Sequence, residues 1–439
     1  MPRLWLGNCC TEHMVDRMDL LDEGDFGGIL FAMKRLVWML RDGDAMVLPR
    51  PVTNTFMRYV ARHTGLDIES IHVISPDSNL LTQDLLHGEE VLGRLREIVK
   101  PDWEFRPYIY DRGAVVFARE LGLDMNEKQG FLEQGGAELF NSKVVFRAFA
   151  SGMGFSIPDG MPCRTTDDLR RTMDCMLSMA SSVIVKRDRA VGGHGNFVVT
   201  TDPALKMVGA LSRICIGDSQ SLDEAVSAAG LTSTHAPQGE VVVEEFHPDC
   251  RSIYAEVFCP GNGSAPYIVN CGELRTAEDP PILVGLEMPL SDMPEGPRKM
   301  FFAEVLRMAQ MMENFGYSGL VNIDAIVSGS GDLWFNEVNA RMGGSTHLNH
   351  IAETLAGSDW ASTHVLLSRF SVRAPAFSSL LDSLLLENLS WDPEKRMGVV
   401  IVADDTETSG TIEYVVLAPT WNEAHDLESR LEKLLTESI

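Results

Sequence analysis

The stretch FNEVNARMGG, residues 335–344, alternates polar and apolar side chains and then ends in two glycines. Glu337, Asn339 and Arg341 occupy every second position, with apolar residues between them. In a β-strand, alternate side chains point to the same face, so a carboxylate, an amide and a guanidinium share one face here. Such a face is costly inside a protein unless something charged lies against it. The sequence therefore predicts a strand that either faces water or binds a charged ligand.

A second strand precedes this one, because the turn SGSGD separates it from the apolar run GLVNIDAIV and predicts a hairpin. Cross-strand neighbours lie within about 5 Å of each other, so oxygens of Asp324, Glu337 and Asn339 can converge. Such oxygens suit Mg²⁺, which prefers one or two carboxylates together with phosphate and water. Arg341 could hold a phosphate or a carboxylate by a bidentate fork. The alternative is an exposed hairpin face with surface ion pairs.

A glycine-rich loop follows the apolar strand that ends at Lys186, in VIVKRDRAVGGHGNFVV. Gly192, Gly193 and Gly195 permit close approach of the backbone to a ligand. A strand lysine with such a loop can present an ammonium group and backbone N–H groups to phosphate oxygens. No G-K-[ST] follows, so the loop is not a Walker motif. A solvated lysine beside a hairpin turn is the alternative.

Two weaker signals accompany the glycine loop. Lys143 begins a predicted helix in NSKVVFRAF, although a lone lysine is usually solvated. The apolar strand EVVVEEF ends in Glu244 and Glu245, which could present backbone groups and a carboxylate to an adenine edge or a ribose hydroxyl. A strand end that meets solvent is the alternative there.

Size and charge limit the classes of partner. The 439 residues are enough for two to four domains of about 100–200 residues. With 37 basic and 63 acidic residues the net charge is −26, so we expect no nucleic-acid partner. No apolar run reaches the roughly 18 residues of a membrane span, so we expect no membrane insertion. The eight cysteines form no C-x-x-C pair, and we expect mostly buried thiols in a reducing cytoplasm.

The pattern of predicted elements changes along the chain. Residues 45–125 alternate short apolar strands with helical segments, which predicts an α/β domain with a parallel sheet. The next part contains antiparallel-type strands and a long helix with a stop at Gly316. The last sixty-odd residues contain two strands and a helix and look like a separate unit. We therefore expect a mixed α+β and α/β fold with domains at 1–124, 125–372 and 373–439.

The succession of motifs resembles the ATP-grasp ligases over roughly residues 125–370, most strongly in NEVNARMGG. The resemblance implies the ATP-grasp fold, in which two α+β subdomains clamp ATP, with an α/β domain before it and a small α+β domain after it. It also implies ATP and two Mg²⁺ ions as cofactors, with Mn²⁺ as a substitute. The implied roles are phosphate contact for Lys143 and Lys186, loop closure for Gly192, Gly193, His194 and Gly195, adenine contact for Glu244, Glu245 and Phe246, metal coordination for Asp324, Glu337 and Asn339, and phosphoryl contact for Arg341.

Two positions leave the resemblance incomplete. The family often carries a ribose carboxylate just after the adenine segment, and either Glu245 or Asp249 could serve here. Many relatives carry a second acid near the position of Asp324, whereas this chain has Asn322. His347 and His350 follow the paired glycines, and we interpret them as helix-start residues near the site rather than as metal ligands.

The activity implied by the resemblance is ATP-dependent ligation of a carboxylate to an amine through an acyl phosphate. Such a reaction needs no protein nucleophile. Arg251 and Arg275 lie on strands expected to line the cleft, where either could act in catalysis by binding the acceptor carboxylate or the tetrahedral oxyanion. Surface ion pairs are the alternative for both.

Within the family, the added C-terminal unit is most similar to peptide ligases of the pheganomycin-biosynthesis type. The expected partners are an amino acid or other carboxylate donor and an amino acid or peptide acceptor, and a homodimer is possible. Two alternatives stay open: a kinase of the same fold that phosphorylates a small-molecule hydroxyl, and a non-catalytic nucleotide-binding protein.

Overall fold

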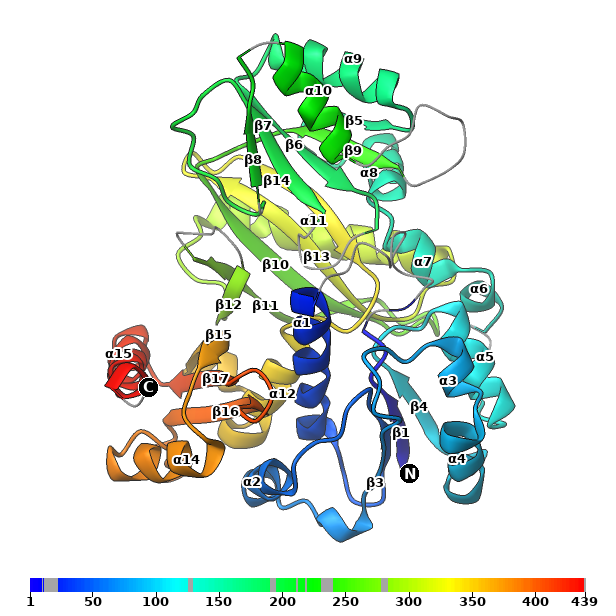
Figure 1. Cartoon of the computed structure of the whole chain (residues 1–439), viewed down its shortest axis with the longest axis vertical. Coiled ribbons are helices and arrows are strands. Elements are labelled where there is room, and N and C mark those ends of the chain that lie inside the picture. Colours follow the sequence, from blue (N-terminus) through cyan, green and yellow to red (C-terminus); the bar gives the residue numbers. More distant parts are fainter. Residues whose placement is uncertain are drawn as a thin grey trace.

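The structure is a computed structural model. It describes residues 1–9, 11, 23–124, 129–189, 195–210, 212–217, 219–229, 240–277 and 283–437. The described elements form three β-sheets with helices around them. Figure 1 shows a five-stranded sheet at the top, a long eight-stranded sheet below it, and the N-terminal strands at the lower right.

The N-terminal residues form the parallel sheet that the alternation of strands and helices over residues 45–125 predicts. Its order is β3-β2-β1-β4, and it also contains β1 (Arg3–Leu6), which lies before that range. Gly65 ends α2 (Asn54–Thr64) in the left-handed conformation, with a φ of 76°, as glycine commonly does at the C-terminal end of a helix. The strands of this part are β1 (Arg3–Leu6), β2 (Ala45–Val47), β3 (His72–Ile74) and β4 (Glu104–Pro107). Its helices are α1 (Glu23–Lys34), α2 (Asn54–Thr64), α3 (Gln83–Leu86), α4 (Arg94–Ile98) and α5 (Arg112–Glu120), with helical turns at Arg35–Met39, Ile68–Ser70 and Glu89–Gly93.

Three helices lead from this domain to the five-stranded sheet, namely α6 (Gln129–Glu133), α7 (Gly136–Phe140) and α8 (Lys143–Gly152). The sheet has the order β5-β9-β6-β7-β8 and packs one face against α9 (Thr166–Leu177) and α10 (Ser219–Ala228). Its strands are β5 (Gly160–Cys163), β6 (Ser182–Arg187), β7 (Asn196–Thr200), β8 (Ser212–Cys215) and β9 (Val241–Glu245). The residues that link β6 to β7 include the expected glycine loop at Gly192, Gly193 and His194, which lies outside the described residues.

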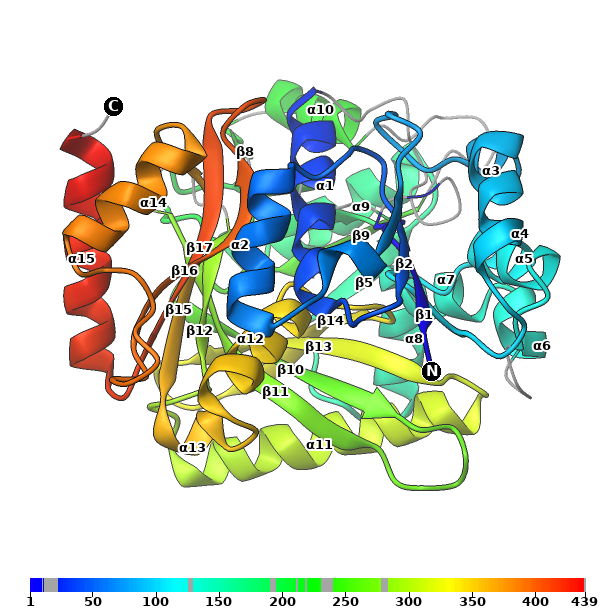
Figure 2. The ribbon, with the colours of Figure 1, turned by 90° about the horizontal axis from the view of Figure 1, so that it is seen from below.

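The eight-stranded sheet has the order β14-β13-β10-β11-β12-β15-β17-β16 and is antiparallel throughout. Figure 2 shows α11 along one face of this sheet and the N-terminal domain on the other side. The strands are β10 (Cys250–Cys259), β11 (Tyr267–Thr276), β12 (Leu283–Met288), β13 (Gly319–Ser328), β14 (Leu333–Asn339), β15 (Val365–Arg373), β16 (Gly398–Asp405) and β17 (Thr411–Ala418). The helices are α11 (Glu295–Asn314), α12 (Thr346–Ala356), α13 (Trp360–Thr363), α14 (Phe377–Leu386) and α15 (Trp421–Glu437).

The C-terminal strands are not a separate sheet. β17 pairs with β15, and β15 pairs with β12, so the expected boundary after residue 372 falls at the end of a strand that the two parts share. One hydrophobic core also joins residues of the N-terminal domain, of α12 and of the C-terminal unit, among them Trp38, Leu348 and Tyr414. The C-terminal unit therefore extends the sheet and also packs against the N-terminal domain.

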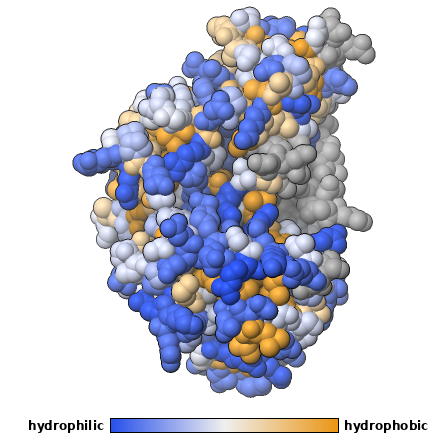
Figure 3. Space-filling model, turned by 90° about the vertical axis from the view of Figure 1, so that its left-hand side faces the viewer, coloured by the Kyte–Doolittle hydropathy of each residue, from blue (hydrophilic) through white to orange (hydrophobic). Residues whose placement is uncertain are grey.

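Of the seven described cysteines only Cys163 and Cys259 are buried, so the expectation of mostly buried thiols is wrong. None of the helices in the described part of the chain is both long enough and apolar enough to cross a membrane. The face seen in Figure 3 is largely hydrophilic, with an apolar patch low in the view. Leu385 and Leu386 of α14 are among the exposed apolar side chains of the described residues.

Candidate functional site

The hairpin of β13 and β14 brings the three expected oxygen-bearing side chains together. Asp324 and Glu337 are direct cross-strand partners, and Asn339 follows Glu337 by two residues on the same strand. The Asn339 side-chain nitrogen donates to Asp324 Oδ2 at 3.0 Å, and the Arg341 guanidinium donates to Asn339 Oδ1 at 2.9 Å. For a metal to bind both Asp324 and the Asn339 oxygen, the Asn339 side-chain amide would have to flip, so that its oxygen rather than its nitrogen faces Asp324.

Two buried lysines face this hairpin from the five-stranded part of the chain. Lys143 begins α8 after the N-cap Ser142, and its Nζ lies 2.9 Å from Glu337 Oε1. Lys186 lies at the end of β6, and its Nζ lies 2.5 Å from Glu244 Oε2 on the neighbouring strand β9. Burying a lysine is costly unless it is paired, so both positions indicate a built site rather than the solvated alternative.

The pKa values of the two carboxyl groups of the hairpin are shifted in opposite directions. Burial, and then the charge of Glu337, raise the pKa of Asp324 to about 7, against the opposing effects of Arg341, Asn339 and Lys143. Burial would also raise the pKa of Glu337, but the charges of Lys143, Lys186 and Arg341 outweigh it and lower that pKa. Two adjacent carboxyl groups cannot both ionise cheaply without a further cation.

A cavity of about 290 Å³ lies between the two large sheets, and these charged groups form part of its wall. An apolar wall, with Ile184, Ala210 and Phe246 from one side and Leu274 and Ile326 from the other, can hold a flat ring. The expected residues that line the cavity are Lys143, Lys186, Glu244, Glu245, Phe246, Asp324, Glu337, Asn339 and Arg341. Glu245 lines it and Asp249 does not, which favours Glu245 between the two ribose candidates.

Glu244 has a different environment from the one its sequence suggests. Its side chain is 2% exposed and both oxygens are occupied, Oε2 by Lys186 and Oε1 by Arg147 at 2.7 Å. Both oxygens therefore already accept from cations in this structure, although Glu244 still lines the cavity. Arg147 was not among the expected residues, because a single arginine inside an apolar helix pattern gives no signal of its partner.

The strand β10, next to β13 in the sheet, carries a second residue that the sequence did not indicate, the fully buried Glu256. It accepts hydrogen bonds from the Thr346 hydroxyl, the Asn270 amide at 2.6 Å and the backbone N–H of Gly343 at 3.2 Å. Burial raises the pKa of Glu256 above its usual value, although the hydrogen-bond donors oppose this effect. This network fixes the chain just after Arg341 and explains why one of the two glycines is needed, since a Cβ on Gly343 would lie 2.3 Å from the Asn322 side chain.

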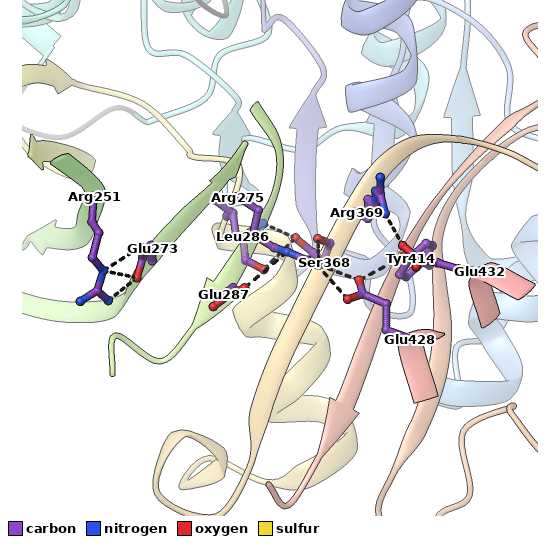
Figure 4. A network of polar contacts seen from close by, with 10 residues as sticks. All are labelled: Arg251, Glu273, Arg275, Leu286, Glu287, Ser368, Arg369, Tyr414, Glu428 and Glu432. Atoms are coloured by element: carbon purple, nitrogen blue, oxygen red, sulfur yellow. Dashed lines mark hydrogen bonds and ion pairs between the residues drawn. The ribbon is translucent and has the colours of Figure 1, made fainter. Parts of the chain in front are cut away.

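Arg251 and Arg275 do not reach the cavity, contrary to the expectation from sequence. Ser252 and Leu274 line it, and because side chains alternate along a strand, their neighbours Arg251 and Arg275 point to the opposite face. Figure 4 shows Arg251 bound to Glu273. The same view shows both nitrogens of the Arg275 fork on Glu428 of α15, at 2.6 and 2.8 Å.

The two histidines after the glycines lie at the start of α12, as expected, but neither lines the cavity. His347 Nε2 lies 3.3 Å from Glu413 on β17, and both side chains are buried. Burial lowers the pKa of His347, and Glu413 opposes this effect.

Of the four expected loop residues, Gly195 is the one that belongs to the described part of the chain. Its carbonyl oxygen accepts a hydrogen bond from the backbone N–H of Arg187, at the base of the connection from β6 to β7.

The donor set of the hairpin fits a hard divalent cation. The described residues contain no cluster of three or more His, Cys, Asp or Glu side chains that could hold a metal by themselves. The hairpin offers oxygen ligands from two carboxylates and one amide, namely those of Asp324, Glu337 and Asn339. Waters and phosphate oxygens typically complete the coordination of Mg²⁺ at such a site. These three residues would hold Mg²⁺ together with waters or phosphate oxygens.

Two domain families match parts of the chain. The Pre ATP-grasp domain matches residues 33–123, and the PGM1 C-terminal domain matches residues 379–431. A search among curated proteins gives no match.

Solved structures match along almost the whole chain. N5-carboxyaminoimidazole ribonucleotide synthetase from Thermus thermophilus is 15% identical with a TM-score of 0.58, over 99% of this chain and 98% of its own. The L-amino acid ligase from Bacillus licheniformis is 12% identical with a TM-score of 0.52, over 99% and 97%. A biotin carboxylase–β-γ-ATP complex from Campylobacter jejuni is 12% identical with a TM-score of 0.57, over 96% and 88%.

Similarity at this level of identity concerns the fold. The two sheets with a cavity between them, the Pre ATP-grasp match and the solved structures agree on one architecture. The chain therefore has the ATP-grasp fold, with a Pre ATP-grasp domain near its N-terminal end.

Proposed function

We propose that this protein is an ATP-dependent ligase that joins a carboxylate to the amine of an amino acid or peptide. The observation that supports this most is the convergence of Lys143, Lys186, Arg341 and the Asp324–Glu337 pair on one cavity between two sheets. Cations suited to phosphate oxygens and oxygen ligands suited to Mg²⁺ then surround the same space. The named ligases among the solved structures of this fold are consistent with that chemistry.

In the proposed reaction, the substrate carboxylate attacks the γ-phosphorus of ATP, which gives an acyl phosphate and ADP. The amine then attacks the acyl carbon, phosphate leaves, and the amine proton is lost to solvent. When bound, Mg²⁺ would neutralise charge on the phosphate oxygens. Lys143, Lys186 and Arg341 hold the transferring group by charge, so no side chain has to form a covalent intermediate. The apolar wall around Phe246 takes the adenine ring, and Glu245 takes the ribose.

The amine substrate and the biological role are finer points of the same proposal. The resemblance of the C-terminal unit favours a peptide ligase of natural-product biosynthesis, working in the cytoplasm. No feature of the cavity selects one amino acid over another. Arg251 and Arg275 are not part of the proposed machinery, because both are engaged in ion pairs outside the cavity.

The test is phosphate release from Mg²⁺–ATP with amino acids and short peptides, supplied singly and in pairs, with mass spectrometry of the products. A ligase requires both an acid and an amine, and yields ADP, phosphate and a product with the mass of the amide. A phosphorylated product without amide would identify a kinase. ATP binding without turnover of any pair would favour a non-catalytic protein.

Two variants of the same hairpin provide the comparison. Glu337→Ala removes a proposed metal ligand and the partner of Lys143, and should abolish turnover. Asp332→Ala changes an exposed carboxylate in the hairpin turn, which bonds only nearby serines in the described structure, and should leave turnover unchanged. Equal turnover by Glu337→Ala and the wild type would contradict the proposed site.

A further inference from the structure

A buried ion cluster lies behind the cavity wall, formed by Arg147 on α8, Glu244 on β9 and Lys186 on β6. Glu244 accepts from Arg147 at 2.7 Å through one oxygen and from Lys186 at 2.5 Å through the other. All three side chains are buried: Arg147 is 8% exposed, Glu244 is 2% exposed and Lys186 is 9% exposed. Lys186 and Glu244 line the cavity and Arg147 does not.

Arg147 is held from a second direction as well. Its NH2 nitrogen donates to the carbonyl oxygens of Pro158, at 3.0 Å, and Gly160, at 2.9 Å. Gly160 begins β5 and pairs with Glu244 in the sheet. One planar guanidinium therefore fixes both the carboxylate and the backbone beside it, a geometry that an ammonium group does not reproduce.

The charges of the cluster do not cancel. Two cations share one carboxylate, so the cluster carries one unit of excess positive charge inside the protein. Of the two cations, only Lys186 borders the cavity, so a ligand anion there can balance the excess. Without Arg147, Glu244 and Lys186 would form a neutral pair, and Lys186 would attract an anion less strongly.

We propose that Arg147 is a positioning residue for nucleotide phosphates: it shares and orients Glu244, and so keeps the Lys186 ammonium available to a phosphate oxygen. This inference rests on the proposed function, because it requires that the cavity binds ATP. It differs from a purely structural role in one respect. Arg147 should affect the binding of the phosphates and not the binding of the nucleoside.

The experiment compares the dissociation constants of ATP and adenosine for the full-length protein by isothermal titration calorimetry. Arg147→Met keeps an unbranched apolar chain in place of the arginine stem and removes the guanidinium with its charge and donors. We expect its ATP affinity to fall roughly 10- to 100-fold, the range for loss of one charged hydrogen bond, with its adenosine affinity unchanged. Arg147→Lys retains the charge but not the fork, and its ATP affinity should lie between those of Arg147→Met and the wild type.

Arg164→Met is the matched control, because Arg164 lies just after β5, is 76% exposed and pairs with Glu240. It should bind both compounds as the wild type does. If Arg147→Met weakens ATP and adenosine equally, Arg147 only supports the fold and the inference is overturned; unchanged ATP affinity overturns it too. If the wild type itself binds no ATP, the proposed function fails first and this inference with it.

Discussion

Lys143 and Lys186 illustrate what single residues of this chain reveal from sequence and what they do not. Their strand and helix positions can be predicted from local patterns. Their partners cannot, because both are far away in the sequence: Glu337 meets Lys143 when the two sheets face each other, and Glu244 meets Lys186 when β9 pairs with β6. For the same reason no local signal marks Arg147 or Glu256, whose roles depend entirely on burial and on distant partners.

His350 makes a prediction at the residue scale that does not depend on the active site. Burial, and then the charges of Arg3 and Arg41, lower its pKa to about 4. The unfolded chain binds this proton more tightly, near pH 6.5, so acid favours unfolding. The contribution is intact above about pH 6.5 and is lost progressively as the pH falls to about 4, by up to about 3 kcal/mol. Urea unfolding at several pH values should show this loss.

The matched variants separate His350 from other acid effects. His350→Gln should flatten the fall in unfolding free energy between these two pH values. His72→Gln, which changes an exposed histidine on β3, should leave the profile as in the wild type. Parallel profiles for His350→Gln and the wild type would show that this histidine does not carry the acid sensitivity.

At the scale of elements, the patterns with a strong period are the ones that sequence predicts well. The β13–β14 hairpin, the long helix α11 and the parallel order of the N-terminal strands all follow from periodicity and turns. The face of a strand is harder to predict where polar residues occur at both odd and even positions. Along β10 and β11, a shift of one residue decides whether an arginine enters the cavity, and Arg251 and Arg275 lie on the other face.

The connection from β14 to α12 gives the prediction at this scale. Gly343→Ala would place a Cβ 2.3 Å from Asn322 Oδ1 inside the Glu256 network, whereas Gly344 has open space around it. We expect Gly343→Ala to lower the unfolding free energy by roughly 1–3 kcal/mol, as overpacking does in cores, and to reduce turnover by moving Arg341. Gly344→Ala is the control and should change neither quantity. Equal unfolding free energies for the two variants, measured in urea, would contradict the role of this network.

At the scale of the whole molecule, the C-terminal unit does not behave as the pattern of its sequence suggests. Its two strands and closing helix can be predicted, and so can their order. Its attachment cannot, because the pairing of β15 with both β12 and β17 depends on contacts between distant segments. The buried Lys34–Asp405 and Arg35–Glu413 pairs then join the N-terminal domain to the same unit. These contacts favour a rigid body formed by the N-terminal domain, the eight-stranded sheet and the C-terminal unit.

Such a body should unfold in one step. A substitution that breaks the ion pair between Arg275 and Glu428 tests this prediction. Glu428 accepts both nitrogens of the Arg275 fork and the Tyr414 hydroxyl, and its side chain is 7% exposed. Glu428→Gln should lower the unfolding free energy by roughly 2–4 kcal/mol, because it removes the negative charge and one acceptor oxygen of the main partner of a largely buried guanidinium. Glu432→Gln, one turn further along α15, breaks an exposed pair with Arg369 and should cost less than about 1 kcal/mol.

Hydrogen exchange in urea shows which parts of the sheet respond to these changes. If the sheet unfolds as one unit, Glu428→Gln raises the exchange of amides in β13 and β17 by the same factor, although only β17 belongs to the C-terminal unit. Faster exchange confined to β16 and β17, with β13 unchanged, would instead mean that residues 373–439 unfold independently. In that case the shared core around Trp38, Leu348 and Tyr414 would contribute little to cooperativity, and the boundary expected from the sequence would be the correct one.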